Sequence, residues 1–152
     1  MKKNKNIAYL FAMFAVITRI IPHPYNLTST ITASVFSGVN FSRRKALCIT
    51  LAGLFISDVA LAIIQQHAIL GSWSLFTYSG LVGITLLAKK TPHHKPVKSI
   101  VYVLGYAGLF WLWTNLGCFI SMPEYPKNIV GLYTCYYNAL PFLKNQLLGN
   151  LI

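Results

Sequence analysis

The chain has 152 residues, of which 55% are hydrophobic and only 10% are charged. Soluble domains carry roughly 25% charged residues, so this composition and the mean hydropathy of +0.57 exclude an ordinary soluble domain and predict a membrane protein. The formal charge of +11 does not indicate a nucleic-acid partner, because most basic residues fall in short clusters between apolar runs, as topology signals do.

The apolar runs predict an all-α fold. The first helix covers residues 7–21 and is stopped by the "PHPYN" segment, in which two prolines flank a histidine. The next stretch, "STITASVFSGVNFS", is too short and too polar to cross a bilayer comfortably alone, so it is either a short helix buried among its neighbours or a re-entrant segment. Further helices are expected at 46–64, 73–88 and 99–117, and a last one runs from about residue 130 to the end, with Pro141 as a kink.

The basic clusters predict the topology. If the short stretch counts as a crossing, six crossings place all the clusters on one side, which is the cytoplasmic side by the positive-inside rule. Five crossings would divide them between the two faces. We therefore expect residues 1–152 to form a single transmembrane helical domain, a polytopic bundle of six helices with both termini cytoplasmic. The clusters are Lys2, Lys3, Lys5; Arg43, Arg44, Lys45; and Lys89, Lys90, Lys95, Lys98.

Two ionisable residues interrupt the apolar helices. Arg19 lies twelve residues after the predicted inner end of the first helix, and Asp58 lies twelve after that of the third. Both are therefore expected about 18 Å above the cytoplasmic side. An unpaired charge at that depth costs at least about 2.5 kcal/mol, which favours an ion pair. Three interpretations stay open: a polar binding site, a structural ion pair, or an Arg19 that snorkels to the interface.

Other polar and aromatic residues are expected at a similar height. Many aromatic residues gather towards the outer side, where they form either an interfacial belt or the lining of a cavity for a flat, ring-containing ligand. The candidate substrate-binding residues are Arg19, Asn26, Asp58, Trp111, Asn115 and Tyr133.

The sequence predicts no metal or cofactor site. Cys48, Cys118 and Cys135 are odd in number and lack CxxC spacing, so we expect packed, reduced thiols. Ala8 and Ala12 form an AxxxA spacing on the first helix, which allows another helix to approach closely.

Several phrases together resemble a family of small bacterial membrane proteins that is related to the substrate-binding S components of energy-coupling-factor (ECF) transporters. The phrases are "PHPYNLTSTITASVFSGVNF", "FISDVAL", "TNLGCFI" and "YPKNIVGLYTCYYNALPFLKNQLLGNLI". Their order spans most of the chain.

The resemblance implies a six-helix bundle in the bacterial inner membrane that binds a vitamin or related micronutrient near the outer face. It also implies that Ala8 and Ala12 contact the T subunit of an energising module, whose separate ATPases hydrolyse ATP. Relatives in that group have an acid near the end of the "LLGNLI" segment, where this chain has Asn150. That departure puts the role of the last helix in doubt.

Two other functions compete with uptake. One is an accessory or structural subunit of a larger membrane complex, favoured by the small size and the AxxxA spacing. The other is an intramembrane enzyme, which would need paired acids, a nucleophile dyad or a metal cluster. One membrane Asp supplies none of these; Asp58 with His23 or His67 is a conceivable acid/base pair, but we expect no enzymatic activity.

Overall fold

The computed structural model describes residues 5–22, 24, 26–92 and 95–151, and this part of the chain contains helices and no strands. The expected all-α fold and the expected six α-helices are confirmed. Lys2, Lys3, His23, His93 and His94 lie outside the described residues. The elements are α1 (Lys5–Ile20), α2 (Thr30–Asn40), α3 (Arg43–Gln65), α4 (Ser74–Leu87), the short 3₁₀ helix η1 (Ala88–Lys90), α5 (Pro96–Ser121) and α6 (Ile129–Gly149).

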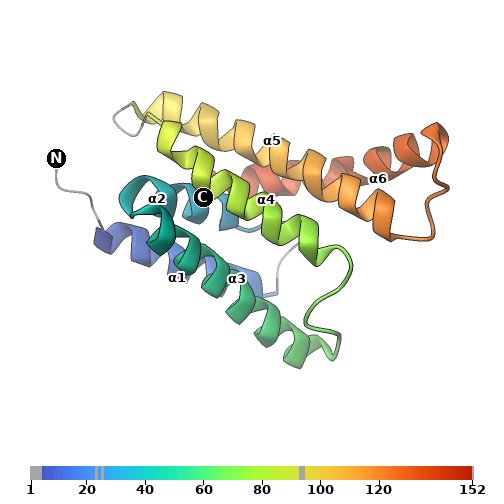
Figure 1. Cartoon of the computed structure of the whole chain (residues 1–152), viewed down its shortest axis with the longest axis horizontal. Helices are drawn as coiled ribbons and strands as arrows, with labels where there is room; N and C mark the ends of the chain where they lie inside the picture. Colours follow the sequence, from blue (N-terminus) through green and yellow to red (C-terminus); the bar gives the residue numbers. More distant parts are fainter. Residues whose placement is uncertain (1–4, 23, 25, 93–94, 152) are drawn as a thin grey trace.

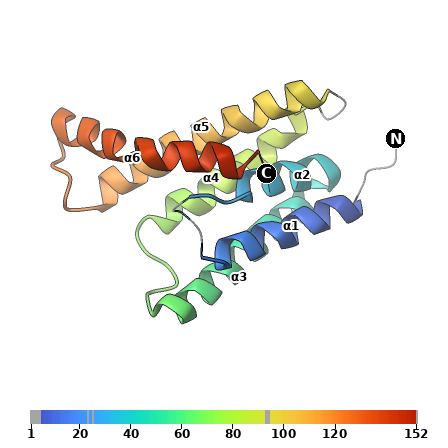
Figure 2. The same cartoon turned by 180° about the vertical axis from the view of Figure 1, so that it is seen from behind.

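The helices form an elongated bundle in which chain neighbours run antiparallel (Figure 1). One side consists of α1 and α3, the other of α4 and α5, and α2 packs against all four. Seen from behind, α6 lies along α5 (Figure 2). Along most of its length α6 packs against α5, and only its C-terminal end reaches the start of α2, so much of its surface has no neighbour among the described residues.

The polar stretch between the first two long helices forms α2, a short helix buried among its neighbours. Its 11 residues span only about 16 Å, and seven of them are buried. Ile31 and Val35 join the main core cluster with Leu54 of α3 and Leu81 of α4. Of the two predicted alternatives, the buried short helix is therefore confirmed.

Small residues allow α2 to sit at the centre. A side chain added at Gly38 would lie 2.4 Å from the Thr85 carbonyl oxygen and 2.6 Å from the Ala88 methyl carbon. Only glycine therefore permits this approach of α2 to α4 and η1. Such contacts between small residues are a common way of packing helices where burial from water does not drive association.

The C-terminal end of α6 closes over the N-terminus of α2. Asn150 Oδ1 accepts a hydrogen bond from the Thr32 backbone N–H at 3.0 Å, and the Asn150 carbonyl accepts one from the Thr32 hydroxyl at 2.7 Å. The N-cap residue of α2, Ser29, makes no side-chain capping bond. Asn150 therefore caps α2 from 118 residues away, and Gly149 allows the close approach, because an added Cβ would lie 2.5 Å from the Thr28 nitrogen.

Basic residues collect at the end of the bundle where α1, α3 and α5 begin (Figure 1). Two helices, Arg43–Gln65 and Pro96–Ser121, are long and apolar enough to cross a membrane, and Asn6–Ile20 is a shorter apolar helix. The six-crossing topology stays a prediction.

Two local expectations can also be compared with the structure. Pro141, the predicted kink, lies inside α6, and the helix continues beyond it to Gly149.

The three cysteines differ in exposure. Cys135 is buried and Cys118 partly buried, but Cys48 is exposed. The prediction of a packed thiol is therefore wrong for Cys48, which lies on a face of α3 that no other helix covers.

Candidate functional site

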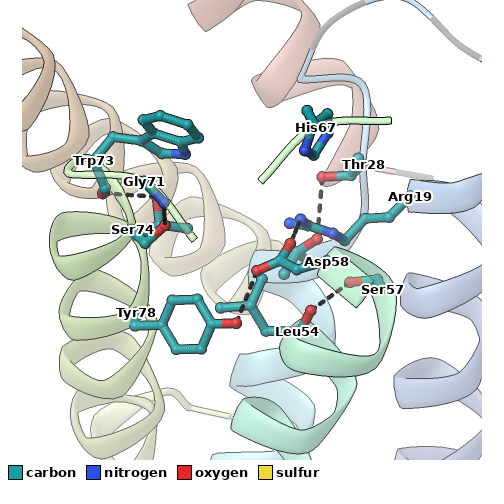
Figure 3. Close-up of polar contacts among 12 residues, drawn as sticks. Arg19, Thr28, Leu54, Ser57, Asp58, His67, Gly71, Trp73, Ser74 and Tyr78 are labelled. Atoms are coloured by element: carbon teal, nitrogen blue, oxygen red, sulfur yellow. Dashed lines mark hydrogen bonds and ion pairs between the residues drawn. The ribbon is translucent and has the colours of Figure 1, made fainter. Parts of the chain in front are cut away.

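Three helices contribute to one polar cluster, which we call the Arg19 cluster: Arg19 of α1, Asp58 of α3 and Tyr78 of α4. The Arg19 Nη2 donates to Asp58 Oδ1, and the Tyr78 hydroxyl donates to Asp58 Oδ2 at 2.8 Å (Figure 3). Both carboxylate oxygens therefore have a donor. Charge-assisted hydrogen bonds of this kind are stronger than neutral ones.

Helix register explains why the two charges meet. Arg19 lies 14 residues after the start of α1, and Asp58 lies 15 residues after the start of α3. At 1.5 Å per residue both stand about 21–23 Å from the end where these helices begin. The predicted ion pair is confirmed, and it excludes the alternative in which Arg19 extends alone to the interface.

The Arg19 cluster is largely shielded from solvent. The Arg19 and Asp58 side chains are 20% and 16% exposed. The Arg19 Nε is buried and has no hydrogen-bond partner among the described residues. Each Asp58 oxygen therefore has one donor, whereas the buried Arg19 Nε donor is unused among the described residues.

A small cavity adjoins Arg19 between α1, α2 and α3. Hydroxyl side chains of Thr30, Ser34, Ser37 and Thr50 contribute to its lining. Its volume is about 20 Å³, and a water molecule needs roughly 10–15 Å³. Pockets for vitamin-sized ligands measure about 300–1,000 Å³, so the cavity in this conformation suits water and is far too small for a vitamin.

Three other candidate residues belong to the α5–α6 hairpin. Trp111 Nε1 donates to the Ala139 carbonyl at 3.0 Å, and Asn115 Nδ2 donates to the Trp111 carbonyl in its own helix at 2.7 Å. Tyr133 is 69% exposed and stacks on Tyr137. The structure does not bring these side chains to the Arg19 cluster, because their contacts are within α5 and α6.

Asn26 lies in the loop before α2, where it is exposed and has a left-handed backbone with φ of 63°. Its carbonyl accepts a hydrogen bond from the Thr28 N–H. Asn is among the residues that adopt this conformation most readily, so the turn accounts for this residue without a ligand.

The small residues of α1 are used within the chain. Ala8 is fully buried in a cluster with Phe41 and Ala46, and Ala12 lines the cavity. The contact of Ala8 and Ala12 with a T subunit stays a prediction, and in this conformation Ala8 is already covered by its own chain. The physical reason is that the AxxxA face faces α2 and α3, while larger residues such as Leu10 and Met13 face outwards.

Sequence reasoning missed two residues with defined roles. Tyr78 is one of the aromatic residues expected on the outer side, and its role as the partner of Asp58 was not predicted. A hydroxyl in an apolar helix is the signal that could have indicated a carboxylate partner. Asn150 was noted only as a departure from related sequences. Its capping role joins residues 118 apart, and no local pattern indicates such a contact.

His67 does not pair with Asp58 in the part of the chain that the structure describes. His67 is exposed, and its Nδ1 lies 2.8 Å from the Ala68 carbonyl oxygen. Among the described residues, no hydrogen bond joins His67 to Asp58, and His23 lies outside them.

Comparison with protein-family models gives one match, which extends over the whole chain. The chain belongs to the DUF6580 family. The function of this family is unknown, and the match covers residues 1–152. No curated protein and no solved structure matches the chain. None of these comparisons links the chain to ECF transporters.

Proposed function

We propose that this chain is a multi-pass protein of the bacterial inner membrane, with the end at which α1, α3 and α5 begin in the cytoplasm. Large apolar side chains on these helices point away from the core: Leu10, Ile63 and Val101 are 63%, 74% and 62% exposed. Contiguous exposed apolar patches on soluble monomers rarely exceed a few hundred Å². A lipid environment accounts for these surfaces, and the clustered positive charge supports the orientation.

Within the bilayer, we infer that the chain binds a small polar micronutrient for uptake, in the manner of a substrate-binding S component. The observation that carries this proposal is the Arg19 cluster. An ionisable pair inside a membrane bundle marks a substrate pathway by default, and Arg19 keeps a buried donor beside a hydroxyl-lined cavity.

The proposal requires a second conformation. Because the cavity volume is about 20 Å³, a vitamin-sized ligand enters only if α1 separates from α2 and α3. Asp58 keeps the Tyr78 hydroxyl as a partner when Arg19 turns towards a ligand, so the carboxylate does not lose all of its donors.

Native mass spectrometry of the detergent-purified protein, with identification of retained small molecules, tests this function. We expect one vitamin-like compound in the wild type and its loss in the double variant Arg19→Gln/Asp58→Asn, which removes both charges, keeps the shape of residue 58 and leaves a shorter polar side chain at residue 19. Thr134→Val is the matched control, since it changes an exposed polar side chain of α6. Empty wild-type protein, or equal retention by the double variant, contradicts the proposal.

A specific observation favours an accessory subunit as the second candidate. The cavity is small, and the N-terminal half of α6 packs against α5 alone among the described helices, which leaves Val130, Tyr133 and Tyr137 more than 60% exposed. For this function we expect the purified protein to be empty and to retain one membrane protein in constant stoichiometry. Tyr137→Ala should release that protein without changing the melting temperature of the chain.

A further inference from the structure

Seven basic side chains form a surface that we call the basic end. They are Arg43, Arg44, Lys45, Lys89, Lys90, Lys95 and Lys98. The chain has only two acids. Asp58 is committed to Arg19 in the middle of α3, and Glu124 lies beyond the opposite end of α5. No acidic side chain of this chain therefore neutralises the basic end.

Tertiary contacts join the two halves of the basic end. Lys89 Nζ donates to the Phe41 carbonyl at 2.7 Å, which ties η1 to the corner between α2 and α3. Lys45 Nζ lies 5.3 Å from the centre of the Phe41 ring. The Tyr106 hydroxyl donates to the Leu87 carbonyl at 3.0 Å and so fixes α5 beside η1. η1 therefore lies between the corner before α3 and the third turn of α5, and the basic residues of α3, η1 and α5 lie at the same end of the bundle.

The charged groups differ in their availability. Lys45 and Lys89 make the contacts with Phe41, whereas Arg43, Arg44 and Lys98 are exposed and make no ion pair among the described residues. An arginine guanidinium can bind a phosphate through two parallel N–H groups. Arg43 and Arg44 of α3 and Lys98 of α5 therefore provide donors for phosphate-containing headgroups at this end of the bundle.

Apolar residues continue directly from the charges along α5. Val97, Ile100 and Val101 are 73%, 47% and 62% exposed. Their spacing of three and four residues puts them on one helix face, next to Lys98. A ligand that combines an anionic head with hydrocarbon chains matches this sequence of surfaces, whereas a nucleic acid offers nothing to the apolar part.

We propose that the basic end binds anionic phospholipids, with their phosphates at its exposed basic side chains, Arg43, Arg44 and Lys98 among them, and acyl chains along the exposed apolar face of α5 at Val97, Ile100 and Val101. This inference rests on the proposed membrane location and does not depend on substrate binding. Basic clusters at the cytoplasmic ends of membrane helices attract anionic lipids, with each charge worth about fivefold in binding.

The test is native mass spectrometry of the full chain in detergent micelles that contain equal amounts of phosphatidylglycerol and phosphatidylcholine. We expect the wild type to retain phosphatidylglycerol preferentially. In Arg43→Gln/Arg44→Gln the retention should fall by about 25-fold, because two charges are lost. Arg43→Lys/Arg44→Lys keeps the charge and should lose less, and Lys144→Gln, an exposed basic residue of α6, should retain lipid as the wild type does.

Each outcome decides the proposal. Equal retention of the two lipids, or unchanged retention by Arg43→Gln/Arg44→Gln, overturns it. Displacement of the lipid by millimolar inorganic phosphate would show that the phosphate alone is recognised, and would overturn the role of Val97, Ile100 and Val101. Failure of the membrane location is separately visible, since the protein would then stay in solution without detergent.

Discussion

Arg19 and Asp58 are stable in apolar helices because each supplies the partner that the other needs. The contact satisfies one guanidinium nitrogen and one carboxylate oxygen, and Tyr78 satisfies the second oxygen. Removing one partner from a buried pair is strongly destabilising, because it leaves a charge without compensation, whereas removing both is often close to neutral. The consequence is a strong coupling between the two positions.

A double-mutant cycle measures this coupling. We expect Arg19→Gln and Asp58→Asn each to lower the free energy of unfolding in detergent by about 2–3 kcal/mol. The double variant should lose clearly less than the sum, because both charges are gone. Thermal melts of the four proteins give the answer, with Lys144→Gln as a surface control expected within about 0.5 kcal/mol of the wild type. Additive losses would show that the pair does not act as a unit.

At the scale of elements, α2 depends on contacts that other helices supply. Its 11 residues are too few for a stable isolated helix, since helices below about 12–15 residues are marginal in water. Burial between four helices and the cap from Asn150 provide the missing stability. Changes at either contact should therefore act on α2 first.

The cap predicts a difference between two substitutions at Asn150. Asn150→Ala removes the acceptor for the Thr32 N–H and should cost about 1 kcal/mol. Asn150→Asp keeps an acceptor for the Thr32 N–H and should keep that amide protected, but it should still lower the melting temperature, because a carboxylate oxygen replaces the Nδ2 that donates to the Gln146 carbonyl at 2.8 Å. Hydrogen exchange at the Thr32 amide, together with melting, separates the two variants, and equal exchange rates in them would contradict the capping role.

The crossing of α2 with α4 predicts a position-specific effect of glycine substitution. Gly38→Ala places a methyl group 2.4 Å from the Thr85 carbonyl oxygen and should destabilise the protein by about 1–3 kcal/mol through overpacking. Gly83→Ala is the control in α4, because nothing lies within 4 Å of its added methyl group. Equal melting temperatures for the two variants would show that α2 can shift without cost.

At the scale of the whole molecule, positive charge lies at one end of the long axis of the bundle and apolar surface lies along its length. The helix starts that carry basic residues share one end of the bundle (Figure 1), and exposed apolar side chains cover the length between the ends. Under the proposed topology, the loop between α3 and α4 faces the opposite side of the membrane from the turn between α2 and α3.

Cysteine accessibility tests this topology. In a background with the three native cysteines replaced, Ser42→Cys and Ser72→Cys introduce thiols at exposed positions in these two turns. We expect a membrane-impermeant maleimide applied to intact spheroplasts to label Ser72→Cys and not Ser42→Cys. Permeabilised cells should label both and so control for reactivity. Labelling of both positions in intact spheroplasts would contradict the proposed topology.

The sequence by itself determined the helical class, the approximate helix bounds and the pairing of Arg19 with Asp58. Each of these follows from distances along the chain: apolar run length, the positions of prolines, and the rise per residue from a helix start. The shortness and burial of α2 were also foreseeable, because its hydroxyl-rich composition favours contacts with protein over contacts with lipid.

Only the tertiary structure decided which side chains contact one another between helices. Tyr78 and Asn150 act through contacts between helices, which depend on rotation and packing that the apolar pattern of these helices does not specify. Trp111, Asn115 and Tyr133 were predicted near Arg19 from height alone, but equal height on a bundle leaves the side of the bundle open. The inward orientation of Ala8 was also not predicted. In a helix that is apolar on every face, the position along the chain predicts the depth in the membrane, but packing against neighbouring helices decides which side chains face inwards.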